Sequence, residues 1–283
     1  MFLEPLPKFP GRTRLSSKNW SLVSDLAWAF MLANVADTVT IKLWSPHGVA
    51  SKTKADGTPV TTADGEAEDA ILRAVGAVHP DDGFLGEEIG SRQSRNERRW
   101  IVDGIDGTSG YVAGLTTWGT LIALEQRGEI ILGVVSSPAQ DKRWWARRDC
   151  GAFADACESN ANGHSIRVSS NKRTSTDRVS TLPVFNGLAR KDQIAVEDAL
   201  SGRPPLNLSQ WSQQMKVAEG KLDACIWFCG DVWDHAAPSV IVEEAGGRFS
   251  DHSGRSRLDS RAAIYSNGAC HNKILDSLKR SQT

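Results

Sequence analysis

The stretch WIVDGIDGTSG, residues 100–110, places two acids three positions apart, directly after an apolar run. The run predicts a buried strand, and a charge at the end of a buried strand is costly unless it is paired or bound to a cation. Two explanations are open: a polar turn that caps the strand, because Asp favours turns, and a cation site. In the second, Asp103 would be held rigidly enough to bridge two ions. Gly104 and Gly107 would let the backbone turn tightly and bring the Ile105 carbonyl inward as a further ligand.

The composition is that of an ordinary globular protein. The chain has 283 residues, which favours about two domains or one large fused unit, and 40% of them are apolar, enough for a sizeable core. The net charge of −1 gives no field that would attract nucleic acid or an anionic membrane. Five scattered cysteines without a C-x-x-C motif are typical of a reducing cytoplasm rather than of a disulfide framework or a zinc site.

Neither a leader nor a membrane span is expected. Residues 1–17 are broken by prolines and lack the apolar core of a signal peptide. No stretch approaches the roughly 18 apolar residues of a membrane span. We therefore expect a cytoplasmic protein that binds a small molecule and neither nucleic acid nor a membrane.

The first half of the sequence predicts an arm, two helices and a meander. Residues 1–18 are expected to form a loosely held arm. A helix is predicted over residues 21–40 from apolar residues at helical spacing, namely Leu22, Val23, Leu26, Phe30, Met31 and Ala33. A second helix is predicted over residues 62–78, begun by a capping box of Thr61 and Asp64. Short apolar runs separated by turns predict antiparallel strands over residues 99–103, 118–126, 129–137 and 143–147.

After about residue 170 the predicted strands and helices alternate, which favours a layered α/β half. The strands are predicted over residues 178–184, 223–228 and 261–267, and the helices over residues 190–201 and 235–247. Gly246 and Gly247 are the expected end of the last helix. The loops of the two sheet-and-helix halves are expected to meet between them.

Four acidic clusters stand at the ends of predicted elements. They are Asp64, the pair Glu87 and Glu88, the pair Asp103 and Asp106, and Asp234. Oxygen-rich sites of this kind suit hard cations such as Mg²⁺. Two metals about 3.5–4 Å apart can activate water on one side and stabilise a leaving oxygen on the other. Each cluster alone also has an ordinary explanation, since paired glutamates are usually solvated and Asp234 suits a helix N-cap.

The order of the motifs carries more information than any one of them. The blocks KADGTPVTTAD, GEE, DGIDGT and WDHAA…EEAGG, spread over residues 52–268, resemble the inositol monophosphatase family of metal-dependent phosphatases. The first block and GVVSSPAQDKRWWARRDCGAF resemble its histidinol-phosphate phosphatase branch. The resemblance implies an α/β, αβαβα layered sandwich. An antiparallel-sheet half over residues 19–170 would carry most metal ligands, and a smaller α/β half over residues 171–283 the WDHAA motif.

The resemblance also implies an activity: Mg²⁺-dependent hydrolysis of a small phosphomonoester by direct attack of metal-activated water, without a phosphoenzyme. Two or three Mg²⁺ ions would be held by Glu87, Asp103, the Ile105 carbonyl, Asp106 and Asp234, with Asp103 as the bridge. Thr108 would orient the attacking water and Asp64 would polarise that hydroxyl, with Glu87 completing the catalytic group. The substrate phosphate would lie near Asp106 and the amides of Gly107 and Thr108. Lys54 or Lys52 would lie near the site, Glu88 beside it, and the protein would form a homodimer.

Two departures from the family pattern bear on the loop and the substrate. Gly104 stands where the family usually carries proline, which would leave the loop more mobile. Trp227 stands where related enzymes place an acid that contacts the substrate, and an indole only donates. Trp227 would therefore either line an altered pocket or pack in the core. Ser209, Gln210 and Trp211 are further candidates for a reshaped pocket.

Trp227 weakens the case for histidinol phosphate and favours another cyclitol, sugar or amino-alcohol phosphate. Alternatives are a 3′-phosphonucleotide or fructose-bisphosphate phosphatase, and a non-catalytic regulator that keeps the fold. A pure binder has no need of the intact acidic set, which argues against the regulator. His235 follows a proposed ligand, but it is more simply explained as a helix residue that faces elsewhere.

Overall fold

The computed structural model describes residues 17–157, 163–172, 178–181 and 211–281. Its larger sheet has eight strands in the order β10-β9-β8-β7-β6-β5-β3-β4. The strands are β3 (Gly83–Gly86), β4 (Gly90–Arg92), β5 (Arg98–Asp106), β6 (Gly119–Gln126), β7 (Glu129–Ser137), β8 (Lys142–Arg147), β9 (Ala152–Asp155) and β10 (His164–Ile166). The meander from β5 to β8 confirms the predicted antiparallel strands. β3 and β4 were not predicted, and β3 pairs with β5 in parallel.

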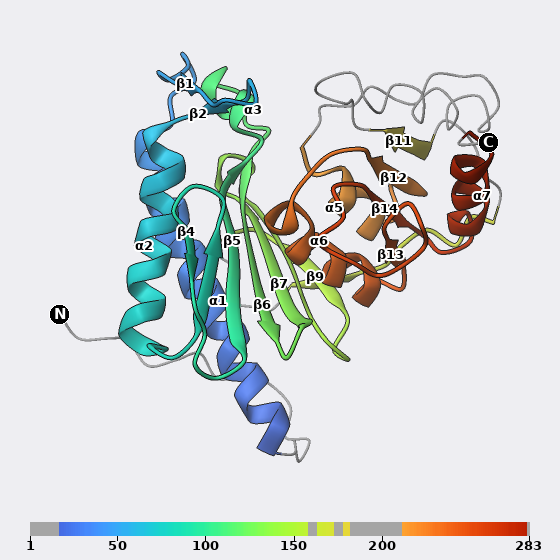
Figure 1. The fold of residues 1–283 in the computed structure, drawn as a ribbon, viewed down its shortest axis with the longest axis horizontal. Helices are drawn as coiled ribbons and strands as arrows, with labels where there is room; N and C mark the ends of the chain where they lie inside the picture. The colour runs from blue at the N-terminus through green and yellow to red at the C-terminus, as the bar shows by residue number, and fades with distance from the viewer. Residues whose placement is uncertain (1–16, 158–162, 173–177, 182–210, 282–283) are drawn as a thin grey trace.

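Two helices cover one face of this sheet, α1 (Ser17–Leu43) and α2 (Thr62–Val78) (Figure 1). α2 has the predicted bounds and the predicted capping box. α1 extends beyond the predicted residues 21–40 and includes residues 17 and 18 of the expected arm; residues 1–16 lie outside the described part. On α1 the buried face is formed by Ala29, Leu32, Ala33 and Ala36. Met31, one of the apolar residues that predicted this helix, is 46% exposed and lies off the buried face.

The expectation that no stretch approaches a membrane span is wrong by length and composition alone, because the segment Asp25–Leu43 of α1 is long and apolar enough to cross a membrane. A helix that packs on a sheet passes the same test. The fully buried alanines and Leu32 join the core cluster of Trp100 and Val102 from β5. We therefore describe this helix as a layer of the sandwich.

The opposite face of the sheet is covered by α6 (Val232–Glu244), which begins three residues before the predicted position. Beyond α6 and the short α5 (Gln213–Ala218) lies a four-stranded sheet in the order β11-β12-β14-β13. Its strands are β11 (Val179–Thr181), β12 (Ala224–Trp227), β13 (Arg248–Ser250) and β14 (Ala263–Ser266). Helix α7 (His271–Ser281) packs on the far side of this sheet.

The layers therefore run helix, sheet, helix, sheet, helix (Figure 1), which confirms the expected αβαβα sandwich. One core cluster joins Ile101 and Leu121 of the large sheet to Val240 of α6 and Tyr265 of the small sheet. The division at residue 170 stays a prediction. The described part of the predicted strand 178–184 is β11, and the predicted helix 190–201 lies outside the described residues. Two further short elements complete the fold: a hairpin of β1 (Lys52–Thr53) and β2 (Pro59–Val60), and the helix α3 (Thr108–Val112), which follows β5.

Candidate active site

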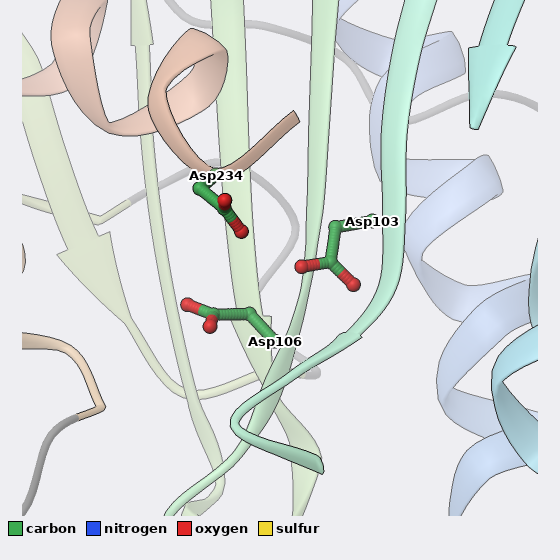
Figure 2. A group of neighbouring side chains, drawn as sticks. All are labelled: Asp103, Asp106 and Asp234. Atoms are coloured by element: carbon green, nitrogen blue, oxygen red, sulfur yellow. The ribbon is translucent and has the colours of Figure 1, made fainter. Parts of the chain in front are cut away.

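Three aspartates from two layers converge where β5 ends. Side chains alternate along a strand, so Asp103 shares its face with Ile101, which packs in the cluster under α6. A register irregularity in β5 between Asp103 and Asp106 allows both side chains to approach the same space. Asp234 reaches them from the first turn of α6, and Figure 2 shows the three carboxyl groups turned toward one another. One oxygen from each lies within 4.8 Å of the others.

The start of α6 fixes the Asp234 side chain. Asp231, and not Asp234, is the N-cap, so the alternative that Asp234 simply caps the helix is wrong. Asp234 occupies position N3 of a capping box, and its Oδ2 accepts a hydrogen bond from the Asp231 backbone N–H at 2.6 Å. This bond holds one carboxylate oxygen and leaves the group turned toward the two aspartates of β5.

Burial and mutual repulsion raise the pKa values of this cluster. The pKa of Asp103, 2% exposed, lies well above its ordinary value because of burial and then the charges of Glu87, Asp106 and Asp234. Burial, then Glu87, raises the pKa of Asp106 to about 7. Burial and Asp106 raise the pKa of Asp234. Three carboxylates that repel one another and offer only oxygen ligands fit a hard divalent cation, which would replace the protons.

Glu87 lies beside this cluster, but its carboxylate is bound to a lysine. Lys54 Nζ lies 2.6 Å from Glu87 Oε1 and also pairs with Glu88. Burial alone would lower the pKa of Lys54, but the two glutamates raise it. The sequence left Lys52 and Lys54 open, and the structure places Lys54 at the site, whereas Lys52 is exposed on β1. Glu87 still acts on the aspartates through its charge.

Thr108 and Asp64 are joined as the resemblance implied. Thr108 Oγ1 lies 3.1 Å from Asp64 Oδ1 and 2.9 Å from the Ile105 carbonyl, and its single hydrogen can be donated to either acceptor. Asp64 Oδ2 accepts from the backbone N–H and the hydroxyl of Thr61 at 2.9 and 2.6 Å. The Asp64 carboxylate thus serves both as part of the α2 cap and as an acceptor for Thr108, and burial raises its pKa.

The tight turn after β5 is made by one glycine, not two. Gly107 has φ +84° and is the N-cap of α3. The expectation that Gly104 also forms the turn is wrong, because Gly104 is buried within β5 and faces α2. A Cβ there would lie 2.6 Å from the Asp64 carbonyl and 3.2 Å from Glu68 Cγ. Glycine at position 104 therefore permits the close approach of α2 to β5.

The residues expected to shape the substrate pocket are in part buried and in part not described. Trp211 is 4% exposed, and a Cβ on Gly107 would lie 2.8 Å from its Cδ1. Trp227 is 8% exposed, belongs to the core around α6, and meets the His235 ring edge-on at 5.4 Å. Ser209 and Gln210 lie outside the described residues. The role of Trp227 in substrate binding stays a prediction.

His235 faces the core. Its side chain is fully buried, and Nδ1 lies 2.8 Å from the Tyr265 hydroxyl. Burial lowers the pKa of His235 to about 3, so the ring is neutral. It therefore supplies no positive charge beside Asp234.

One buried acid near the site was not predicted. Glu68 on α2 is fully buried and accepts backbone N–H bonds from residues 87–89. Its position was visible in the sequence as a charge on the otherwise apolar face of Ala67, Ile71 and Val75.

Comparisons with known proteins agree with this geometry. Residues 24–283 match the Inositol monophosphatase family. The histidinol-phosphatase of Mycobacterium tuberculosis is 36% identical over 262 residues, which cover 90% of this chain and 97% of that protein. The histidinol-phosphatase of Streptomyces coelicolor is 35% identical, with 91% and 98% covered. The solved structure of Thermotoga maritima IMPase superposes with a TM-score of 0.78 at 26% identity, covering 92% of this chain and 98% of that chain.

The family match spans most of the chain, and its motifs supply the residues that converge here. The chain belongs to the inositol monophosphatase family, a family of phosphoric monoester hydrolases.

Proposed function

We propose that this enzyme hydrolyses a small-molecule phosphate monoester, a cyclitol, sugar or amino-alcohol phosphate, in a Mg²⁺-dependent reaction. The observation that carries the proposal is the convergence of Asp103, Asp106 and Asp234 beside the Thr108–Asp64 pair. A cluster of mutually repelling carboxylates next to an oriented hydroxyl suits hydrolysis that requires divalent cations and positioned water.

The three aspartates would hold the metal, with Glu87 and the Ile105 carbonyl as further oxygen ligands. When bound, divalent cations lower the pKa of water and offset the charge that develops on phosphate oxygens. Glu87 must first exchange its contact with Lys54, at 2.6 Å, for a ligand role or share it. The Lys54 ammonium would then be available to a phosphate oxygen a short distance away.

The remaining steps belong to the chain's own groups. The Thr108 hydroxyl, held by Asp64, would accept a hydrogen bond from the attacking water and orient it toward phosphorus. Asp64 keeps the hydroxyl hydrogen turned away from that water. The backbone amides of Gly107 and Thr108 are the proposed donors to the phosphate oxygens of the substrate.

The choice of substrate rests on two opposed observations. The relatives named histidinol-phosphatase are 33–36% identical to this chain and favour an amino-alcohol phosphate. Trp227, which cannot accept a hydrogen bond from an amine, favours a substrate without one. We infer that a small phosphomonoester with a cyclic or polyol leaving group fits the site, and that histidinol phosphate is the reference compound to test against it.

Phosphate release from a panel of monoesters tests the proposal, measured with Mg²⁺ and with EDTA. The panel contains histidinol phosphate, inositol phosphates, hexose phosphates, a 3′-phosphonucleotide and fructose bisphosphate. Asp103→Asn is expected to lower kcat by at least about 10³-fold, since charge-stabilising groups carry much of such catalysis. Equal release with EDTA and with Mg²⁺, or an active Asp103→Asn variant, would contradict the mechanism.

The panel also decides between the alternatives. A preference for the 3′-phosphonucleotide or for fructose bisphosphate would replace the monoester proposal. No release from any ester, with a cation bound and the fold intact, would favour the non-catalytic regulator. We further propose a cytoplasmic location, which five cysteines not joined in disulfides support, and a homodimer, which sedimentation equilibrium would test.

A further inference from the structure

The carboxylate of Glu68 lies where α2, β3 and β5 meet. Its side chain is fully buried. Oε1 accepts the Glu87 N–H at 3.0 Å, and Oε2 accepts those of Glu88 and Ile89, each at 3.0 Å. The backbone N–H of Gly104 lies close enough to lower the pKa of the same carboxylate, although burial raises that pKa to about 7. Among the described residues no basic side chain pairs with Glu68, so backbone amides alone satisfy this buried acid.

Two glycines make room for the carboxylate. A Cβ on Gly86, at the end of β3, would overlap Glu68 Oε2, and a Cβ on Gly104, in β5, would lie 3.2 Å from Glu68 Cγ. Both glycines therefore permit a close approach that a larger residue would prevent. The cradle of Gly86, Gly104 and the amides of residues 87–89 is shaped to this one side chain.

The two segments that Glu68 joins are the ones that carry the proposed ligands. Residues 87–89 follow β3 and include Glu87. Gly104 lies between Asp103 and Asp106 on β5. These segments are 15 or more positions apart in the sequence, and the pairing of β3 with β5 and this carboxylate bring them together.

We propose that Glu68 is a positioning residue that sets the distance between the Glu87 segment and the Asp103–Asp106 segment, and so the metal affinity of the site. The inference rests on the proposed function, because it assumes that these segments hold a cation. Groups that orient metal ligands through hydrogen bonds change metal affinity about 10–100-fold when they are removed.

Asp82 offers a matched control at the other end of the same strand pair. It is 1% exposed and accepts from Trp100 Nε1 at 2.9 Å and from Asn96 Nδ2 at 2.7 Å. Asp82 thus ties the start of β3 to β5, as Glu68 ties the end. Glu68→Gln and Asp82→Asn are the same chemical change, and both remove a buried hydrogen-bonded charge.

The test measures Mn²⁺ binding, by electron paramagnetic resonance of the free ion, and backbone amide exchange of the metal-free protein. We expect Glu68→Gln to lower Mn²⁺ affinity by about tenfold or more and to speed exchange at residues 87–89 and 104 together. Asp82→Asn should lower the melting temperature but leave Mn²⁺ affinity within about twofold, because it touches no ligand segment.

Each outcome decides a different question. Wild-type Mn²⁺ affinity in folded Glu68→Gln, or an equal loss in Asp82→Asn, would overturn the inference. If the wild-type protein binds no Mn²⁺, the proposed function fails. The positioning role is then tested by amide exchange alone, and it requires that Glu68→Gln speed exchange at residues 87–89 and at residue 104 together. If Glu68→Gln does not fold, Glu68→Asp, which keeps the carboxylate on a shorter side chain, takes its place in the test. If neither variant folds, the role of Glu68 is structural only, and the inference is overturned.

Discussion

Asp106→Asn is expected to stabilise the metal-free enzyme while removing its metal binding. In the metal-free protein, burial and the charge of Glu87 raise the pKa of Asp106 from its ordinary 3.8 to about 7. The folded protein therefore binds more protons than the unfolded chain between these pH values, and wild-type stability falls as pH rises through this window. Asparagine has no charge to ionise, so the variant lacks this loss.

The pKa difference sets the size of the effect. At 1.36 kcal/mol for each pH unit, the raised pKa of Asp106 lowers the free energy of unfolding, relative to its value at low pH, by at most about 4 kcal/mol at pH 8 and about 2 kcal/mol at pH 5. Relaxation and solvent near this partly exposed group reduce these values, so we expect a gain of about 2 kcal/mol at pH 8 for the variant. The gain should vanish toward pH 4.

Urea unfolding in EDTA at several pH values measures the gain, followed by repetition in Mg²⁺. Mg²⁺ should stabilise the wild type by binding the folded state and should stabilise the variant much less. Asp69→Asn, at an exposed ion pair with Arg73 on α2, is the control and should change stability by under about 1 kcal/mol at every pH. A difference between Asp106→Asn and wild type that does not grow with pH would refute the reasoning.

Three further changes test other parts of the site and fold. Lys54→Gln should raise Mn²⁺ affinity severalfold and weaken inorganic phosphate binding, because it frees Glu87 and removes a cation; unchanged calorimetric titrations would contradict this. Burial lowers the pKa of His271 to about 4, so the free energy of unfolding should fall as pH drops from 6.5 to 4. In urea titrations over this pH range, His271→Asn should remove up to about 3 kcal/mol of that fall. Gly119→Ala should destabilise by about 1–3 kcal/mol, because its Cβ would overlap the Ser136 carbonyl and Trp211; a double-mutant cycle with Trp211→Ala should show coupling.

Local signals in the sequence predicted the elements around the site well. Helix α2 has the predicted bounds because Thr61 and Asp64 form the cap that their spacing indicates. The β6–β7 hairpin follows from two long apolar runs joined by Arg127 and Gly128. In each case the signal lies within a few residues of the element that it specifies, so one sequence suffices to find it.

Contacts between distant segments were predicted where the family resemblance implied them, as for Thr108 with Asp64, but not where they depend on the pairing of β3. β3 is four residues long and contains two glycines, so its sequence shows neither a clear period nor a strong strand propensity, and its parallel partner β5 begins 12 residues after it ends. The direction in which Gly104 faces was nevertheless available from strand parity: Trp100 and Val102 pack under α1 and α2, and Gly104 follows them on that face. The burial of Glu68 could be read from its place on the apolar face of α2, but its partners could not, because they are backbone amides that no residue type reveals.

Gly104 illustrates how two opposed effects decide the behaviour of the loop. A glycine loses more conformational freedom on folding than other residues, which costs about 0.5–1 kcal/mol and led to the expectation of a mobile loop. A Cβ at position 104 would lie 2.6 Å from the Asp64 carbonyl and 3.2 Å from Glu68 Cγ, and overpacking of this kind costs about 1–3 kcal/mol. Proline, which the family pattern favours at this position, would place its ring atoms in the same space. The overlap is the larger effect, so glycine at this position lets α2 approach the end of β5, while Asp103 on the opposite face stays turned toward Asp234.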